Sequence, residues 1–249
     1  MSEVLVKLEN VHKEFVLSHS GASSIKTLLL WWKRRSKEKL NALNGISFEV
    51  KRGESVALIG RNGAGKSTTL SLISRIYKAT SGTVTVNGRL APLLELGAGF
   101  HPDLTGLDNV LFNGMIMGLT RKQVTERLPQ IIAFAELDKH IDAPVRTYSS
   151  GMLARLGFAV AVHVDADVLI VDEVLAVGDF TFEKKCYDFI DQFRKQGGTI
   201  LFVSHNAESV KRVADRCVWL KGGLVHMDGD PESVLASYQA DAAAPNEGL

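Results

Sequence analysis

The sequence predicts an α/β fold with a mainly parallel sheet, a small antiparallel β portion near the N-terminus and an inserted helical lobe. Short apolar runs at Ser55–Ile59, Val168–Val171 and Thr199–Val203 have the length and composition of buried strands. The last two runs each follow a helix-like stretch, which is the alternation of a parallel βαβ sheet. A chain of 249 residues, 45% hydrophobic and 23% charged, is long and apolar enough to form one domain that carries such a lobe.

The other elements follow from alternation and turn residues. Val4–Phe15 and Leu43–Val50 favour strands, and Thr83–Val86 favours a strand that enters a hairpin turn at Asn87 and Gly88. We further expect a domain over 1–240, a helical lobe at about 98–158, an insertion at about 18–40, a late hairpin over Arg216–Met227 and a flexible tail at 241–249.

Composition argues against several classes of function. The net charge of +1 gives no chain-wide positive field, so we expect no nucleic-acid partner. Cys186 and Cys217 form neither a CxxC pair nor part of a metal cluster, which favours buried thiols in a reducing cytosol. Met1–Phe15 lacks the features of a signal peptide, and no apolar run approaches the ~20 residues that span a bilayer. Any role at a membrane is therefore expected to be peripheral.

A glycine-rich loop predicts a phosphate-binding site. The residues from Gly60 to Ser67 fit the pattern GxxxxGK(S/T), after a buried strand and before a helical pattern. Glycines allow backbone N–H groups to turn toward phosphate oxygens, and the following helix presents its positive end. Lys66 is expected to bridge the β- and γ-phosphates, and the Ser67 hydroxyl to ligate Mg²⁺. The predicted ATP-binding residues of this loop are Gly60, Asn62, Gly63, Ala64, Gly65, Lys66, Ser67 and Thr68.

Two further strand ends supply the rest of a catalytic centre. Asp172 ends the apolar run that begins at Val168, and Glu173 follows it directly. Because side chains alternate along a strand, these two carboxylates leave in different directions. We expect Asp172 to hold Mg²⁺ and Glu173 to activate the attacking water. His205, just beyond the strand Thr199–Val203, is expected to sense the γ-phosphate.

A further motif completes a resemblance to ABC ATPases that covers about residues 3–238. Tyr148–Met152, with the sequence YSSGM, stands between the phosphate loop and Asp172 and precedes an apolar helix. This is the position of the family's LSGGQ-like motif, which binds the γ-phosphate of ATP held by the other subunit. A serine hydroxyl, glycine N–H groups and a helix N-terminus together form an anion site. The resemblance implies that Ser149, Ser150 and Gly151 act on the partner's ATP.

The resemblance also implies the wider architecture. It indicates a RecA-like P-loop core with an N-terminal antiparallel β portion, and a homodimer that holds two ATP molecules with Mg²⁺. Phe15 matches the aromatic residue that stacks on adenine, although ordinary core packing is an alternative for this side chain. Asp179 matches the loop that crosses the dimer interface.

Three local variants are similar to the ATP-binding subunits of bacterial polysaccharide exporters, those for O-antigen, teichoic acid and related capsule glycans. They are Leu93–Phe100 at the glutamine loop, the YSSGM motif, and Asp172–Asp179 in place of DEPxxxLD. The likeness implies two copies of an integral membrane permease and a peripheral location on the cytoplasmic face of the bacterial inner membrane. The residues expected to contact the permease here are Gly97, Gly99, Phe100 and His101.

Glu95 departs from the general family pattern, because it occupies the glutamine position. A carboxylate can contact Mg²⁺ or its water, but it also adds negative charge near the phosphates. Both a metal-contacting role and a role limited to signalling toward the permease remain open for Glu95.

The insertion at about 18–40 has the pattern of an interfacial helix. An apolar face is predicted by Ile25, Leu28, Leu29 and Trp32, which follow i, i+3, i+4, i+7 spacing. A basic cluster follows at Lys33, Arg34, Arg35, Lys37 and Lys39. Such a helix can lie on anionic lipid beside the permease, or it can pack on the protein's own sheet with a solvated basic end.

The sequence therefore predicts an ATP-hydrolysing subunit that powers polysaccharide export. The alternatives are an ABC ATPase with another substrate and a soluble, non-transport ABC ATPase. A binding module without catalysis is a further rival, and the intact set of Lys66, Asp172, Glu173 and His205 argues against it.

Overall fold

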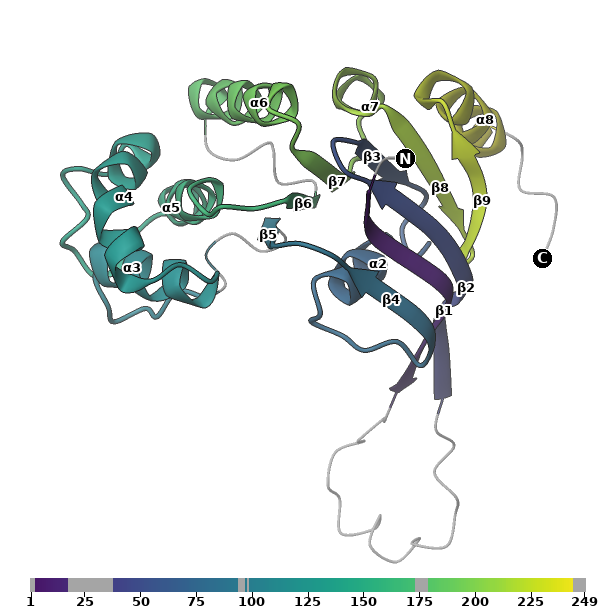
Figure 1. Ribbon diagram of the computed structural model, residues 1–249, viewed down its shortest axis with the longest axis horizontal. Helices are drawn as coiled ribbons and strands as arrows, with labels where there is room; N and C mark the ends of the chain where they lie inside the picture. Colours follow the sequence, from purple (N-terminus) through teal and green to yellow (C-terminus); the bar gives the residue numbers. More distant parts are fainter. Residues whose placement is uncertain (1–2, 18–37, 94–96, 98, 173–178, 244–249) are drawn as a thin grey trace, which may run out of the picture.

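The computed structural model describes residues 3–17, 38–93, 97, 99–172 and 179–243. These residues form two sheets and a helical lobe (Figure 1). The smaller sheet has the order β2-β1-β4 and is antiparallel, and the larger has the order β5-β6-β7-β3-β8-β9. Its first five strands run parallel, while β9 pairs antiparallel with β8. The predicted α/β class is therefore confirmed.

The strands are β1 (Val4–Leu17), β2 (Glu38–Lys51), β3 (Ser55–Ile59), β4 (Ser81–Val86), β5 (Leu90–Leu93), β6 (Val168–Asp172), β7 (Thr199–Val203), β8 (Arg216–Lys221) and β9 (Leu224–Gly229). The helices are α2 (Lys66–Ile73), α3 (Gly106–Ile116), α4 (Arg121–Ala135), the short 3-10 helix η1 (Val145–Thr147), α5 (Ser150–Val162), α6 (Phe180–Lys195), α7 (Ala207–Val213) and α8 (Pro231–Ala243).

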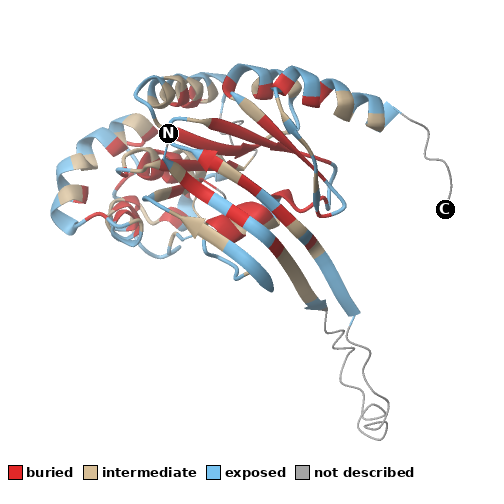
Figure 2. Cartoon of the chain, turned by 45° about the vertical axis from the view of Figure 1, so that its right-hand side comes forward, coloured by how far each residue is buried: buried red, intermediate tan, exposed pale blue. Residues whose placement is uncertain are grey.

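Each face of the parallel sheet has its own hydrophobic core. On β3, the side chains of Val56 and Leu58 face the antiparallel sheet and α2, whereas Ala57 and Ile59 face α6, α7 and α8. This division follows from the alternation of side chains along a strand. Figure 2 shows the buried strands and α2 between the layers. Because both faces are covered, the strands can be apolar throughout, as the burial of all five β3 residues shows.

The helical lobe consists of α3, α4 and α5, around a third core. Its helices begin at capping residues that satisfy otherwise unpaired N–H groups. Thr105 caps α3, and Thr120 forms a capping box with Gln123 at α4. Ser149 caps α5 by accepting a hydrogen bond from the Met152 N–H at 3.2 Å. The lobe thus extends beyond the expected limit of 158, because α5 continues to Val162.

Several local expectations were wrong. Asn87 and Gly88 do not form a hairpin, because β4 pairs with β1 and the next strand, β5, pairs with β6 in the other sheet. Residues 38–40, expected in the insertion, belong to β2, and residues 241–243, expected in the tail, belong to α8. The late hairpin of β8 and β9 is confirmed.

Candidate functional site

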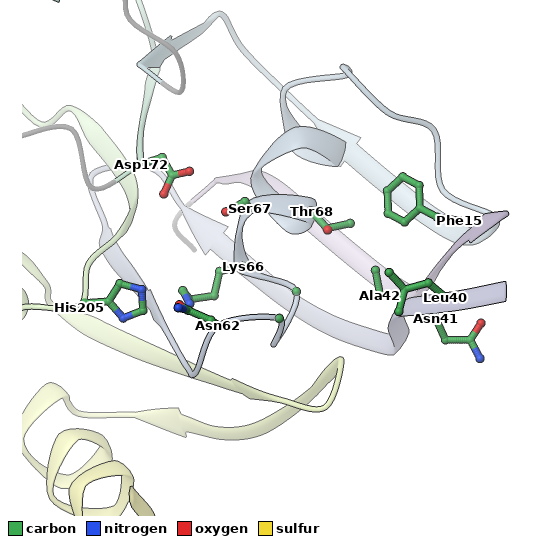
Figure 3. Close-up of a pocket in the computed structure, with 12 residues that line it drawn as sticks. Phe15, Leu40, Asn41, Ala42, Asn62, Lys66, Ser67, Thr68, Asp172 and His205 are labelled. Carbon is green, nitrogen blue, oxygen red and sulfur yellow. The ribbon is translucent and has the colours of Figure 1, made fainter. Parts of the chain in front are cut away.

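The predicted phosphate-binding loop borders a cavity of about 640 Å³ (Figure 3). The loop supplies Asn62, Gly63 and Gly65, and the start of α2 supplies Lys66, Ser67 and Thr68. The remaining lining residues come from four other places in the chain: Phe15 on β1, Leu40, Asn41 and Ala42 on β2, Asp172 at the end of β6, and His205 after β7. Motifs far apart in the sequence are therefore gathered around one space of the size that holds a nucleotide.

The loop reaches this shape because its glycines adopt backbone angles that other residues avoid. Gly60, Gly63 and Gly65 have φ angles of 149°, 79° and 104°. Lys66 is the first residue of α2 and only 6% exposed, and its ammonium donates to the carbonyl oxygens of Gly60 at 2.7 Å and Arg61 at 3.2 Å. A buried cation is thus held at the N-terminal end of a helix, which is favourable for binding an anion.

Gly60 and Gly63 provide a matched stability test. An added Cβ at Gly60 would lie 2.3 Å from the Leu220 backbone oxygen, whereas one at Gly63 would meet nothing within 4 Å. Gly60→Ala is therefore expected to lower the free energy of unfolding by at least about 3 kcal/mol, because backbone must move as well as adopt a strained angle. Gly63→Ala is expected to lower the free energy of unfolding by only about 1–2 kcal/mol, the cost of a left-handed backbone angle for alanine. Urea unfolding of the nucleotide-free variants measures both; equal losses would contradict the close contact at Gly60.

The predicted acid and histidine line the same end of the cavity as Lys66. Asp172 ends β6 and His205 follows β7. These strands lie side by side, and β7 also neighbours β3, which leads into the phosphate loop. Figure 3 shows both side chains on the side of the cavity where Lys66 and Ser67 lie. Parallel strands bring their carboxyl ends to one edge, so the fold itself assembles this cluster.

The Ser67 hydroxyl and the Asp172 carboxylate fit a magnesium ion. Both are oxygen donors of the kind that Mg²⁺ prefers, and both line the cavity. Among residues that the structure describes, no group of three or more His, Cys, Asp or Glu side chains could hold a metal. Two protein ligands suit Mg²⁺ in particular, because it usually retains waters and binds phosphates of the substrate. Glu95 and Glu173 lie outside the described residues.

An aromatic cluster forms the far end of the cavity. Phe15 pairs with Leu40 across the β1–β2 ribbon, and its ring meets the Tyr77 ring edge-on with centroids 5.3 Å apart. The Lys13 ammonium lies 4.8 Å from the Phe15 ring centroid and donates to the Lys78 carbonyl oxygen at 3.0 Å. Phe15 is thus half-buried at the cavity rather than within a core, which supports the stacking role over the alternative of core packing.

The predicted trans-acting residues do not line this cavity. Ser149 and Ser150 are exposed at the N-terminus of α5 in the helical lobe, and Gly151 is half-buried there. Asp179 caps α6, where its Oδ1 accepts from the Phe182 N–H at 3.0 Å, and it pairs with Arg155 of the same chain. Within one chain, these residues and the phosphate loop are therefore parts of separate surfaces.

The residues predicted to contact a permease lie near the start of the helical lobe. His101 is exposed, and its N–H donates to Oδ1 of the buried Asn109 at 2.7 Å. Gly99 is exposed, and Gly97 is half-buried with a φ angle of 84°. Phe100 differs, because its ring packs against the core of the lobe. The predicted insertion residues Ile25, Leu28, Leu29 and Trp32 lie outside the described residues.

Sequence reasoning missed several lining and neighbouring residues. Leu40, Asn41 and Ala42 belong to the part of β2 that precedes the predicted strand at Leu43. They could have been found from strand pairing. Once Phe15 is placed at the cavity, the residues opposite it on the antiparallel partner strand must lie there too. Tyr77 follows α2 and carries no pattern that would have identified it.

Comparison with known proteins agrees with this site. The sequence profile of the family described as ABC transporter matches residues 43–176. The O-antigen export system ATP-binding protein RfbB of Klebsiella pneumoniae is 49% identical over 241 residues, which cover 95% of this chain and 98% of the relative. The teichoic acids export ATP-binding protein TagH of Bacillus anthracis is 42% identical, and the match covers 94% of this chain but 42% of the relative.

Two solved structures share the fold. A dimeric ATP-binding cassette in a post-hydrolysis state with ADP and Pi has a TM-score of 0.73 and 21% identity, covering 91% of this chain and 99% of that one. The ATP-binding subunit of an ABC transporter has a TM-score of 0.75 and 23% identity, covering 96% and 95%.

The fold and the phosphate-loop cavity thus define an ATP-binding cassette. The chain belongs to the ABC transporter family, and within it to the group of ATP-binding proteins of the O-antigen and teichoic acid export type.

Proposed function

We propose that this chain is the ATPase subunit that powers export of a lipid-linked polysaccharide through a membrane permease. The observation that carries the proposal is the phosphate-loop cavity, with Lys66, Ser67, Asp172 and His205 around it. It occurs in a chain that matches an O-antigen export ATP-binding protein over nearly the full length of both. The glycan itself is an O-antigen, a teichoic acid or a related polymer.

The cavity suits transfer of the γ-phosphoryl group of ATP to water. Lys66 would bridge the β- and γ-phosphates, and Ser67 and Asp172 would hold Mg²⁺, which supplies positive charge to the phosphate oxygens. Glu173 would orient the attacking water and accept its proton, and His205 would contact the γ-phosphate. Adenine would stack on the exposed face of Phe15 at the other end of the cavity.

A homodimer would complete each site. Ser149 and the N-terminus of α5 do not line the cavity of their own chain, and they would offer an anion-binding surface to a partner. A head-to-tail pair would set Ser149 of each chain against ATP held by the other, giving two equal sites. This arrangement accounts for the separation of the two surfaces within one chain.

The helical lobe offers a surface for the permease. On α3 and just before it, Leu104, Phe112, Met115 and Ile116 are 38%, 48%, 41% and 64% exposed. Three of them follow the i, i+3, i+4 spacing of one helix face. Contiguous exposed apolar side chains of this kind mark protein interaction sites. We place two permease subunits here, one on each cassette, with Gly97, Gly99 and His101 at the edge of the contact.

The insertion is proposed to lie at the cytoplasmic face of the inner membrane. The motivation is its sequence pattern: an apolar face that includes Trp32, followed by basic residues that suit anionic headgroups. Lys39 does not belong to the predicted basic cluster, because it lies on β2 and pairs with Glu14 at 2.8 Å. No helix in the described part of the chain is both long and apolar enough to span a bilayer.

Trp32→Glu is expected to impair glycan export in cells while leaving the ATPase of the isolated subunit within about twofold of normal. The reason is that a carboxylate opposes insertion between anionic headgroups. Surface glycan measured by gel staining, beside phosphate release by the purified variant, gives both values. A matched loss of ATPase would contradict a role confined to the membrane.

The proposed function is tested by deleting the gene in its host and restoring it. Deletion should remove the surface polysaccharide and leave the lipid-linked glycan inside the cell. The wild-type chain should restore export, and a Lys66→Ala chain, expressed at the same level, should not. Surface glycan that persists in the deletion strain would favour the alternative of a different substrate.

A further inference from the structure

An ionic network away from the cavity joins three helices. Arg155 of α5 pairs through one guanidinium nitrogen with Asp179 at the start of α6, and through another with the Glu136 carboxylate at 3.3 Å. Glu136 is the C-cap of α4, and its second oxygen accepts from Lys185 of α6 at 3.1 Å. Arg155 is therefore the single residue by which α5 enters this network.

Arg155 is also the most buried member of the network. Its side chain is 18% exposed, compared with 61% for Asp179 and 47% for Glu136. Its guanidinium carbon lies 5.1 Å from the centroid of the buried Phe182 ring on α6. A planar guanidinium can engage two carboxylates and an aromatic ring together, whereas the compact ammonium of a lysine cannot. Ion pairs shielded in this way are less screened than those fully in water.

The network connects two functional parts of the chain. Ser149 caps the same helix, α5, on which Arg155 lies. Asp179 caps α6, the next helix in the chain after Asp172. Asp179 makes both contacts at once, since one carboxylate oxygen accepts from the Phe182 N–H and the other pairs with Arg155. The hydrogen bond from the Phe182 N–H holds the pKa of Asp179 below its usual range, and the charge of Arg155 and its hydrogen bond lower this pKa further.

We propose that Arg155 is a positioning residue that couples the two ATP sites of the dimer. The inference rests on the proposed function, in which Ser149 contacts the ATP of the partner chain. When Ser149 engages that ATP, α5 is drawn toward it, and Arg155 transmits the displacement to the start of α6. Asp172, which lines the ATP site of the same chain, precedes the start of α6 in the sequence. Occupancy of one ATP site is in this way communicated to the other.

The test uses Arg155→Met, which keeps an unbranched apolar stem against Phe182 and removes the charge. The dimer is assayed in a Glu173→Gln background, by light scattering at increasing ATP. We expect the ATP concentration for half-maximal dimerisation to rise about tenfold. In the otherwise wild-type enzyme, kcat should fall by a similar factor. Changes of this size are within the range of coupling measured between residues of one network. Binding of a fluorescent ATP analogue to the monomer should change less than twofold, since Arg155 does not line the cavity.

Lys185→Met is the matched control. It removes an ion pair with Glu136 and leaves the contacts of α5 unchanged. We expect a thermal stability loss similar to that of Arg155→Met, with kcat and dimerisation near normal. Equal functional losses in the two variants, or a normal Arg155→Met dimer, would overturn the coupling role. Arg155→Lys should recover part of the loss, because one carboxylate can still be reached.

Asp179→Asn provides a second variant in case Arg155→Met does not fold. Asparagine caps helices as well as aspartate does, so the bond from the Phe182 N–H is retained while the ion pair is lost. The double variant should be no worse than Arg155→Met alone, since both substitutions remove the ion pair between Arg155 and Asp179. Additive losses would overturn the proposal. If the Glu173→Gln parent itself stays monomeric with ATP, the homodimer of the proposed function fails instead.

Discussion

Glu173→Gln is expected to bind ATP normally and to hydrolyse it at least about 10²-fold more slowly, because a positioned base contributes ~10²–10⁴ to the rate. Glu173 directly follows Asp172, the carboxylate that borders the cavity at the end of β6. A glutamine keeps the shape and hydrogen-bonding capacity of the side chain but cannot accept a proton from water. Phosphate release at saturating ATP measures the change, and nucleotide titration confirms that binding is intact.

Glu126→Gln is a suitable control for this substitution. Glu126 lies on the surface of α4, where it forms a 3.9 Å ion pair with Lys122, one turn earlier on the same helix. Exposed pairs of this type contribute little, so its ATPase should be unchanged. Near-normal turnover in Glu173→Gln would contradict the assignment of this residue as the base.

Lys66→Ala and Ser149→Ala chains are each expected to lose ATPase by about 10² or more, and to regain activity when they are mixed. Each homodimer would have both sites damaged. In the mixed dimer, one site would lose both residues and the other would keep both, because the two residues serve the same ATP from opposite chains. Loss of a group that stabilises the transferred phosphoryl costs on the order of 10²–10³ in rate. Random pairing makes half of the dimers mixed, so about a quarter of wild-type activity should return.

Recovery of activity on mixing distinguishes action between chains from action within one chain. If Lys66 and Ser149 acted on ATP within one chain, every site in the mixture would still lack one of them, and no activity would return. Mixing Lys66→Ala with a Glu173→Gln, Lys66→Ala chain provides the negative control, because every site in that mixture lacks Lys66. Recovery that is independent of the Ser149 substitution would contradict the trans site.

Most of the site could be predicted because its motifs are local. The phosphate loop needs glycines at fixed spacing before Lys66, and this pattern is visible without knowledge of the fold. Asp172 and His205 were found because each follows a short apolar strand, and parallel strands bring such ends together. Site residues whose position depends on one local segment can therefore be predicted from the sequence.

What could not be predicted depends on long-range pairing. Asn87 and Gly88 have the composition of a hairpin turn, but β4 completes one sheet and β5 begins at the edge of another. Pairing of Val168 and its neighbours with β5 outweighs the local turn preference. The meeting of Tyr77 with Phe15 likewise follows from how the end of α2 packs near β1, and not from either residue's neighbours in sequence.

The network around Arg155 was also outside the reach of sequence patterns. Arg155 falls within an apolar helix, where a single basic residue suggests only a solvated side chain. Its burial against Phe182 and its pairing with Asp179 arise from the packing of α5 on α6. Such partners come from different helices at large separations in sequence, so spacing rules do not indicate them.

ATP is expected to join two copies of this chain through Ser149. The most direct measurement is the mass of Glu173→Gln in solution by light scattering, with and without ATP, alone and combined with Ser149→Ala. We expect a monomer without ATP, a mass twice as large with ATP, and a return to the monomer when Ser149 is replaced. A Glu173→Gln dimer that forms equally well without Ser149, or no dimer at saturating ATP, would contradict it.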